Sequence, residues 1–205
     1  MNTNSLLSQD QHDALSEIVN IGMGRAGEQL AKVLETFVEL SIPKIATTDQ
    51  DEIKPTITRL IDSEREYVCT RQAFFGHWRG EAMTLFYQDT NEQLATLMGY
   101  QGDRNADLET ELKLDISNIL VGACMNGIAH TLDFKLKFGP PSLVSKRTYA
   151  DNIFDTSKFN WQNVLFIEVS FALENLDFRA HLLIVMEDSG IDILRKDLDS
   201  FLDNL

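Results

Sequence analysis

Three polar residues near the N-terminus share one face of an expected helix. Asp13, Glu17 and Asn20 stand at positions i, i+4 and i+7, and this spacing confines them to an arc of roughly 60° on a helix. A carboxylate can pair with a cation, and an asparagine amide both accepts and donates hydrogen bonds without acting as a general base. The chemistry open to this trio is therefore the holding and orienting of a bound group.

The helix that carries the trio is expected over residues 9–35. Ser8 precedes it and Gln11 follows three residues later, which is the capping-box arrangement at a helix start. Packing the apolar side of this helix into a core would point the trio at solvent. That apolar side consists of Leu15, Ile18, Val19, Gly22, Ala26, Leu30 and Val33.

Two glycines, Gly24 and Gly27, extend the polar face by one turn. A glycine inside a helix costs about 0.8–1 kcal/mol relative to alanine, so two of them call for an explanation. Close approach by the backbone of a partner is one explanation, and we expect a docking surface here.

The same spacing returns in the second half of the chain. Glu111, Asp115 and Asn118 again stand at i, i+4 and i+7, and Gly122 follows the asparagine by four residues, as Gly24 follows Asn20. For a single helix, a solvated polar face is the simpler interpretation. The recurrence favours a pair of related sites.

The recurrence extends to most of the chain, because a shift of 98 residues without a gap superposes further identical residues. The sequence therefore predicts an α+β fold in a single domain, residues 1–205, built from two pseudo-symmetric helix–three-strand–helix repeats at about 8–100 and 106–205. The repeats should share an antiparallel-rich sheet, with the two long helices lying together. The matched pairs are Asn20 with Asn118, Gly24 with Gly122, Pro43 with Pro141, Ala82 with Ala180 and Leu85 with Leu183.

Runs of β-branched and aromatic residues predict the strands, and apolar periodicity predicts the helices. Polar turns are expected at 49–55 and 102–107, a longer loop at 148–162, and the boundary between the halves near 100–106. The first repeat has expected strands at 37–48, 66–75 and 81–88 and a short helix at 91–99. The second has a helix at 107–132, strands at 133–146, 163–174 and 178–187, and a helix at 191–202.

Composition excludes several classes of function. The 205-residue chain has a formal charge of −14 and no local Lys/Arg cluster, which disfavours binding to nucleic acid or anionic membranes. Its apolar stretches are too short to span a bilayer and the first residues lack a signal-peptide pattern, so we expect a cytoplasmic protein. Cys69 and Cys124 are expected to be buried, reduced thiols.

Other polar and aromatic residues are assigned structural roles. The four histidines lie far apart with no paired metal-ligand spacing, so no metal site is expected. His181 sits in an apolar strand and should be hydrogen-bonded beside the core. Trp78 should be carried by a hairpin turn at 76–82, and a role in stacking on a ligand is the less favoured alternative.

The motif resembles the signature of the CheC/CheX/FliY family of response-regulator phosphatases. That signature reads Asp or Ser, three residues, Glu, two residues, Asn, 22 residues and Pro, and Asp13, Glu17, Asn20 and Pro43 match every defined position. The stretch "NIGMGRAGEQLAKVL" is similar to the glycine- and alanine-bearing helix of that family. Two copies resemble a CheC-like rather than a CheX-like arrangement.

The resemblance implies a phosphatase that hydrolyses the aspartyl phosphate of a CheY-like receiver domain in chemotaxis. The receiver would supply Mg²⁺, and this chain would bind no cofactor or metal of its own. Asn20 and Asn118 would orient the attacking water, while Glu17 and Asp115 would pair with the active-site lysine of the receiver. Partner-binding or motif-supporting roles would fall to Asp13, Gly24, Pro43, Glu111, Gly122 and Pro141.

The second copy departs from the signature. Glu111 stands where the family has Asp or Ser, and Asp115 replaces the glutamate with a side chain that is one methylene shorter. We therefore expect the site on the first helix to be the stronger one, and the second to be weaker or only a binding surface.

Alternatives of another class remain open. One is a noncatalytic adaptor of the same fold, like the middle domain of the flagellar switch protein FliM, which lacks the Glu–Asn pair; such an adaptor would bind a receiver, the deamidase CheD or a flagellar switch component. Binding to CheD in addition to catalysis is a further possibility. The internal pseudo-two-fold symmetry favours a monomer.

Overall fold

The first helix, α1 (Gln9–Leu34), begins at the predicted capping box. The Ser8 hydroxyl accepts a hydrogen bond from the backbone N–H of Gln11, and the Gln11 side chain accepts one from the Ser8 N–H. The computed structural model of the chain describes residues 6–87, 95, 99, 106–154, 162–174 and 178–204. Within them, the second long helix, α4 (Ala106–Thr131), lies one residue from its expected start.

A sheet of eight strands joins the two halves of the chain. The strand order is β1-β7-β8-β4-β3-β5, with β2 also paired to β7 and β6 also paired to β3, and all of these pairings are antiparallel. The outer strands of each half therefore pair with a strand of the other half. The bounds are β1 (Val38–Leu40), β2 (Lys44–Asp49), β3 (Tyr67–Gly76), β4 (Gly80–Tyr87), β5 (Leu136–Phe138), β6 (Ser142–Thr148), β7 (Asn163–Leu173) and β8 (Arg179–Glu187).

Each outer strand is broken in the same place. The break between β1 and β2 contains Pro43, and the break between β5 and β6 contains Pro141. A proline has no N–H to give to a strand ladder, so it interrupts pairing at a sheet edge. The continuous strands expected at 37–48 and 133–146 were thus too long, and the fold class itself, an α+β chain with repeated elements around an antiparallel sheet, is confirmed.

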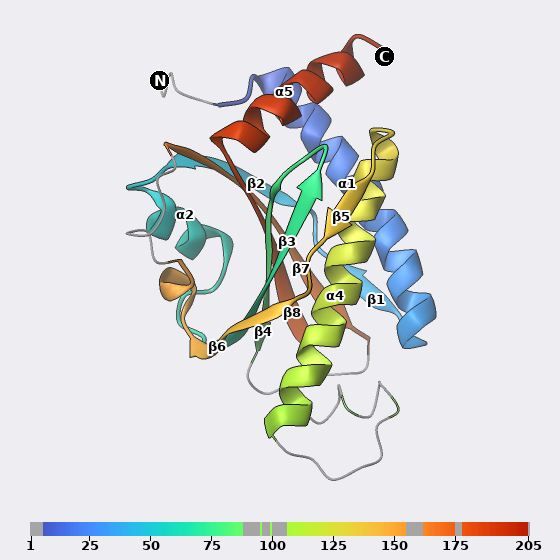
Figure 1. The fold of residues 1–205 in the computed structure, drawn as a ribbon, viewed down its shortest axis with the longest axis vertical. Helices are drawn as coiled ribbons and strands as arrows, with labels where there is room; N and C mark the ends of the chain where they lie inside the picture. Colours follow the sequence, from blue (N-terminus) through green and yellow to red (C-terminus); the bar gives the residue numbers. More distant parts are fainter. Residues whose placement is uncertain are drawn as a thin grey trace.

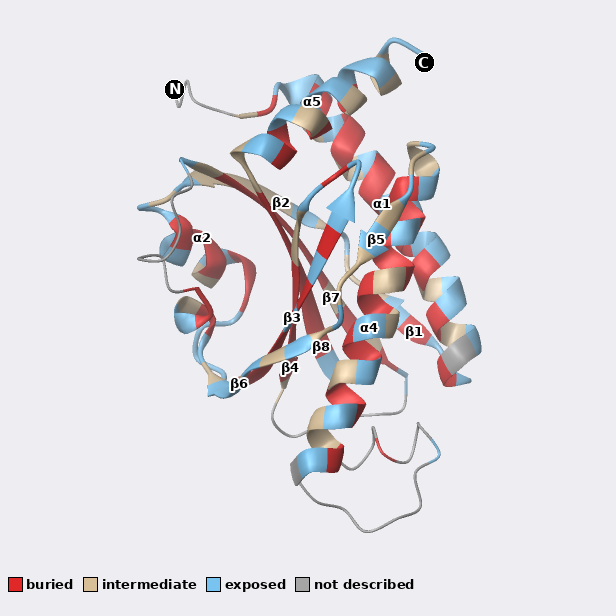
Figure 2. Cartoon of the chain, in the orientation of Figure 1, coloured by how far each residue is buried: buried red, intermediate tan, exposed pale blue. Residues whose placement is uncertain are grey.

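The helices cover the sheet in two layers (Figure 1). α1 and α4 lie side by side and antiparallel on one face, with α5 (Asp188–Leu202) across their end of the sheet, and they share the larger core. On the other face lie α2 (Ile53–Leu60) and the 3-10 turn η2 (Ala150–Asn152), over the smaller core. Both sides of the sheet are therefore buried over much of their area, as Figure 2 shows.

Glycine permits the close crossing of the two long helices. A Cβ atom added at Gly127 would lie 2.3 Å from the carbonyl oxygen of Gly22, and one added at Gly22 would lie 2.7 Å from the backbone nitrogen of Ile128. Real Cβ contacts are never this short, so both positions need glycine. This crossing fixes how the polar faces of α1 and α4 sit relative to each other.

Several expectations about local structure were wrong or lie outside the described residues. The segment 49–55 was expected to be a turn, but α2 begins at Ile53, and η2 lies within the loop expected at 148–162. The helix expected at 91–99 and the boundary expected near 100–106 fall almost wholly outside the described residues. Among the helices that the structure describes, none is long and apolar enough to cross a bilayer.

Two residues that the sequence singled out have the structural roles expected of them. Trp78 is buried, packs on Phe134 with 4.8 Å between ring centroids, and donates a hydrogen bond from Nε1 to Asp197 of α5 at 2.6 Å. His181 is hydrogen-bonded beside the core to Glu168 and Tyr87. Trp78 therefore anchors the β3–β4 turn to the helical layer.

Candidate functional site

The first polar trio lies on the solvent side of α1. Asp13, Glu17 and Asn20 are all exposed, while the described apolar side chains of the opposite side are buried in the larger core. These are Leu15, Ile18, Val19, Ala26 and Leu30. The colours of Figure 2 follow this division along the helix. The expected orientation of the trio is thus the one that the chain adopts, because burying the apolar stripe turns the polar side outward.

The side chains of this trio differ in whether they are hydrogen-bonded within the protein. Asp13 accepts a hydrogen bond from Gln9 at 2.9 Å, one turn earlier on the same helix. Glu17 and Asn20 make no side-chain hydrogen bond or ion pair with any residue that the structure describes. A carboxylate and an amide are therefore displayed together with their hydrogen-bonding capacity open to an incoming molecule.

The two glycines beside the trio have different surroundings. Gly24 is exposed and a Cβ added there would meet nothing within 4 Å, so the surface beside Asn20 is clear. Gly27 was expected to extend the same face, which was wrong: it is half-buried, and a Cβ there would lie 3.1 Å from Leu40. Gly24 alone leaves open surface, and Gly27 makes room for the edge strand β1.

The second trio is displayed in the same way on α4. Glu111, Asp115 and Asn118 are exposed, and a Cβ added at Gly122 would meet nothing within 4 Å. Among the described residues, neither Glu111 nor Asp115 has a side-chain partner. Seen from solvent, the two copies offer carboxylate, amide and open glycine in the same order.

Asn118 differs from Asn20 because a buried residue holds it. Gln72 of β3 donates from Nε2 to the Asn118 Oδ1 at 2.8 Å and to the Gly139 carbonyl oxygen at 2.9 Å. Gln72 is only 1% exposed, and its own Oε1 is buried without a hydrogen-bond partner. The amide of Asn118 is therefore tied to the sheet and to the strand break that contains Pro141.

A cluster of hydroxyls lies directly behind Asn118. Ser117, the preceding residue of α4, is fully buried, and its Oγ lies 2.8 Å from Thr70 Oγ1 and 2.9 Å from Thr84 Oγ1. The helix is thereby hydrogen-bonded to β3 and β4. Neither this cluster nor Gln72 was identified from the sequence, because each partner is 33 or more residues away and no local pattern signals it.

The two asparagines are too far apart to act on one small group. Gly22 and Gly127 meet where the antiparallel helices cross, and Asn20 and Asn118 precede these glycines by two and nine residues. At 1.5 Å per residue in opposite directions, the asparagines are about 16 Å apart along the helix axes. They constitute two separate sites.

The prolines of the motif lie off the helices, half-buried in the strand breaks. In the first break, Ser41 donates its N–H to the Ser170 carbonyl at 3.0 Å and accepts the Ser170 N–H on its hydroxyl at 3.0 Å. In the second break, Gly139 donates its N–H to Ala73 and receives Gln72 on its carbonyl. The break beneath Asn118 is thus hydrogen-bonded to that residue through Gln72.

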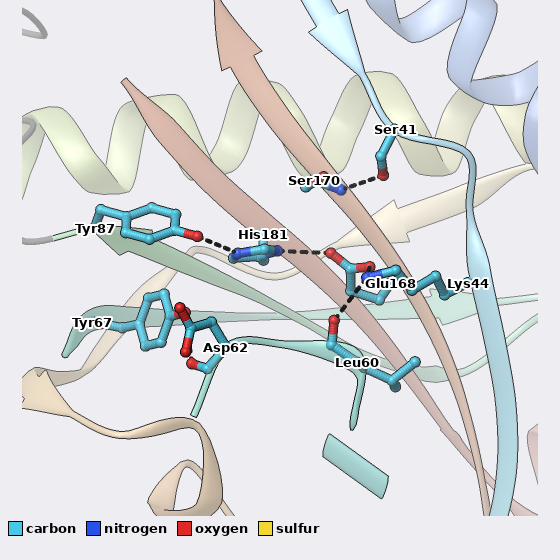
Figure 3. A network of polar contacts seen from close by, with 9 residues as sticks. All are labelled: Ser41, Lys44, Leu60, Asp62, Tyr67, Tyr87, Glu168, Ser170 and His181. Carbon is cyan, nitrogen blue, oxygen red and sulfur yellow. Dashed lines mark hydrogen bonds and ion pairs between the residues drawn. The ribbon is translucent and has the colours of Figure 1, made fainter. Parts of the chain in front are cut away.

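A third polar group lies on the far face of the sheet, away from both trios (Figure 3). His181 bonds through Nδ1 to the fully buried Glu168 at 2.7 Å and through Nε2 to the Tyr87 hydroxyl at 3.0 Å. Lys44 lies 3.3 Å from Glu168 and donates to the Leu60 carbonyl at the end of α2. These contacts join five elements, namely β2, β4, β7, β8 and α2, so the group ties α2 to the sheet.

The two thiols, and the His, Cys, Asp and Glu side chains of the described residues, were considered for nucleophilic and metal chemistry. Burial raises the pKa of the Cys69 thiol to about 12 and raises that of Cys124 as well, so both stay protonated at neutral pH. Both thiols are free and buried, as expected. Within the described residues, no group of three or more His, Cys, Asp and Glu side chains is placed to hold a metal ion.

Comparison with solved structures identifies the fold. FliY of Thermotoga maritima matches 96% of this chain and 99% of its own with a TM-score of 0.70 at 16% identity. FliM of H. pylori, in its complex with FliG, matches 93% and 100% with a TM-score of 0.59 at 14% identity. The chemotaxis protein CheX of Vibrio vulnificus matches 82% and 97% with a TM-score of 0.52 at 17% identity. No protein-family model matches the chain. The chain therefore has the CheC-like fold that these proteins share.

Proposed function

We propose that this chain is a cytoplasmic phosphatase that hydrolyses the aspartyl phosphate of a CheY-like receiver domain in chemotaxis signalling. The observation that carries the proposal is the pair Glu17 and Asn20, exposed on α1 without side-chain partners in the described chain. The pair belongs to a motif that resembles the signature of the CheC/CheX/FliY phosphatases at every defined position. The fold that this chain has in common with FliY and CheX supports the same proposal.

The proposed reaction needs positioning more than it needs reactive groups. Phosphoryl transfer passes through a loose transition state, and catalysis consists mainly of alignment and charge stabilisation. The receiver would supply both the aspartyl phosphate and the Mg²⁺ beside it. Asn20 would accept a hydrogen bond from a water on its carbonyl and hold that water in line with the phosphorus. Its solvent-facing position suits that task.

Glu17 would set the register of the docked complex by pairing with the lysine of the receiver's active site. It stands one turn before Asn20 on the same face, so both side chains reach one pocket. The open surface at Gly24 leaves room for the receiver's backbone beside Asn20. Asp13, held by Gln9, would border the same contact.

The second copy would dock a receiver less well. Asp115 is one methylene shorter than a glutamate, so a lysine of the receiver would have to approach α4 more closely to pair with it. The two asparagines are about 16 Å apart along the helices, so one receiver would occupy one site at a time.

A noncatalytic adaptor is the second candidate function. It is favoured by the likeness to FliM, whose solved complex with FliG shows that this fold can serve in assembly. An adaptor would bind a receiver, CheD or a flagellar switch component without accelerating phosphate loss. The exposed Glu17 and Asn20 favour the enzyme, because an adaptor has no need for an unengaged water-orienting amide.

The deciding experiment adds the purified chain to a phosphorylated receiver from the same organism in the presence of Mg²⁺ and follows the loss of the phosphate label. The phosphatase accelerates that loss at substoichiometric amounts of chain. Binding to the receiver without acceleration, for every receiver of the organism, would support the adaptor instead.

A further inference from the structure

We propose that Gln72 is a positioning residue that distinguishes the second site from the first. It turns the carbonyl oxygen of Asn118 toward the sheet, so that Asn118 offers its NH₂ group, and not its carbonyl, to a docked receiver. This inference rests on the proposed phosphatase function and deepens it: α1 carries the water-orienting site, while α4 carries a docking site.

The orientation of the Gln72 amide follows from its partners. A backbone carbonyl can only accept, so the atom of Gln72 that lies 2.9 Å from the Gly139 oxygen must be the NH₂ nitrogen. The same nitrogen lies 2.8 Å from Asn118, and its second hydrogen requires an acceptor there. The atom of Asn118 that faces inward is therefore its carbonyl oxygen, and the NH₂ group faces solvent.

The arrangement has a cost that an apolar residue would avoid. Gln72 is 1% exposed and its Oε1 is buried without a partner. An unsatisfied buried acceptor destabilises a fold, and a residue of similar size without polar atoms would avoid this. A specific task for the NH₂ group accounts for the presence of glutamine at this place in the core.

The first half of the chain has no equivalent of Gln72. Through the inner strands, Gln72 pairs with Ala82, whose repeat counterpart Ala180 pairs with Phe171. The outer strands give a second comparison. Continued by one residue, the register of β6 on β3 sets Gln72 opposite Pro141, and the register of β2 on β7 sets Val169 opposite Pro43, the repeat counterpart of Pro141. Both Phe171 and Val169 are buried and apolar, so neither can hold Asn20.

Catalysis depends on whether the carbonyl or the NH₂ group of the asparagine amide faces the attacking water. A water aligned for attack donates a hydrogen to the orienting amide, so the amide must present an acceptor. Asn20 is free to do so, since its side chain has no partner in the described chain. Asn118 is held with a donor outward, which suits contact with an acceptor on the receiver surface and not the orientation of that water.

The test is a gain of activity, which a merely structural role does not produce. In the background Asn20→Ala/Asp115→Glu, the first site is disabled and the second has the family's carboxylate. Adding Gln72→Met keeps the size of the side chain and removes its donor, which releases Asn118. We expect kcat for receiver dephosphorylation to rise roughly three- to tenfold, the range of one neutral hydrogen bond, with KM changing little.

Thr70→Val in the same background is the matched control. It removes a hydroxyl that contacts Ser117 on the same helix, two residues from Gln72 on β3, and leaves the Gln72–Asn118 hydrogen bond in place. It should not raise kcat. An equal gain from Thr70→Val would mean that loosening α4 suffices, and would overturn the role of Gln72.

A second measurement does not depend on activity. In a ¹⁵N-labelled wild-type chain, the side-chain NH₂ of Gln72 should exchange with solvent slowly, because both hydrogens are bonded and buried, whereas the NH₂ of Asn118 should exchange as a free amide. Protection of the Asn118 NH₂ with free exchange at Gln72 would overturn the inference.

The outcomes separate the two proposals. A wild-type chain that fails to accelerate phosphate loss refutes the proposed function and with it the catalytic meaning of Gln72. An active wild-type chain whose Asn20→Ala/Asp115→Glu variant gains nothing from Gln72→Met refutes the role of Gln72 and leaves the proposed function standing.

Discussion

The surfaces of α1 and α4 are alike, but the layers beneath them are not. Both helices display a carboxylate, an asparagine and an open glycine at matching positions. Beneath Asn118 lie Gln72 and the hydroxyls of Ser117, Thr70 and Thr84, whereas the sheet beneath α1 presents apolar side chains such as Val169 and Phe171. A motif repeated at the surface therefore does not have to repeat its chemistry, because the supporting residues decide which atom of an amide faces outward.

The largest expected difference between the two sites is in the rate of receiver dephosphorylation. Asn20→Ala should lower receiver dephosphorylation by about 10²-fold, as loss of one preorganised group does, because it removes the water-orienting amide. Asn118→Ala should change it by less than about threefold, the scale of one exposed polar contact. The measurement is the loss of phosphate label from the receiver at saturating chain. Near-normal rates in Asn20→Ala and in the double variant would refute the assignment of Asn20.

The next largest expected difference is in the affinity for the receiver. Glu17→Lys places a like charge against the receiver's lysine and should weaken the complex by roughly tenfold or more, because juxtaposed like charges at an interface cost several kcal/mol. Asp115→Lys should have a smaller effect. Titration calorimetry at low and high salt measures both, and the difference should shrink as salt screens the exposed charges. Glu17→Gln serves as the control that removes charge without repulsion, and its effect should fall between those of wild type and lysine.

Substitution of the glycines by alanine should change the free energy of unfolding differently at open surface and at the contact between the helices. Gly24→Ala and Gly122→Ala should each raise the free energy of unfolding by about 0.5–1 kcal/mol, since nothing lies near the added Cβ and alanine favours helix. Gly22→Ala should destabilise the chain by about 1–3 kcal/mol through its clash with Ile128. Thermal or urea unfolding compares the three.

Of the two open glycines, Gly24 should matter more for docking. Gly24→Ala should weaken receiver binding while stabilising the chain, and Gly122→Ala should weaken binding less, because the second site docks a receiver less well. Equal effects on binding would mean that the receiver uses both helices alike.

The smallest expected effect comes from lengthening the second carboxylate. Asp115→Glu in an Asn20→Ala background should strengthen receiver binding by about fivefold or less, because an exposed ion pair contributes at most about 1 kcal/mol. Surface plasmon resonance with immobilised receiver has the sensitivity for this. A gain as large as the loss caused by Glu17→Lys would show that reach alone separates the two sites, with no part for Gln72.

The sequence predicted the long helices and the solvent exposure of both trios because these depend on local periodicity. α1 has an apolar stripe and begins at the Ser8–Gln11 capping box, and α4 repeats the i, i+4, i+7 spacing of its polar residues 98 residues later. The motif residues follow from spacing on a helix, so their exposure could be predicted without knowing the fold.

What was missed depends on short elements and on contacts distant in sequence. α2 was taken for a turn because Pro55 and the acidic residues before it read as loop, although the buried residues Ile53, Ile57 and Leu60 have helical spacing. The exchange of outer strands between halves requires a register that the shift of 98 residues does not contain. Gln72 reads as one polar residue in a strand, and only the packing of α4 on β3 gives it a partner.

The most direct test of the account is a structure of this chain bound to a receiver that carries Mg²⁺ and beryllofluoride on its phosphorylatable aspartate. We expect α1 at the receiver's pocket, Glu17 paired with the pocket lysine, and the Asn20 carbonyl within hydrogen-bonding distance of a water in line with the beryllium. A complex in which the receiver leaves Glu17 and Asn20 in solvent, or in which Asn118 presents its carbonyl to that water, would contradict it.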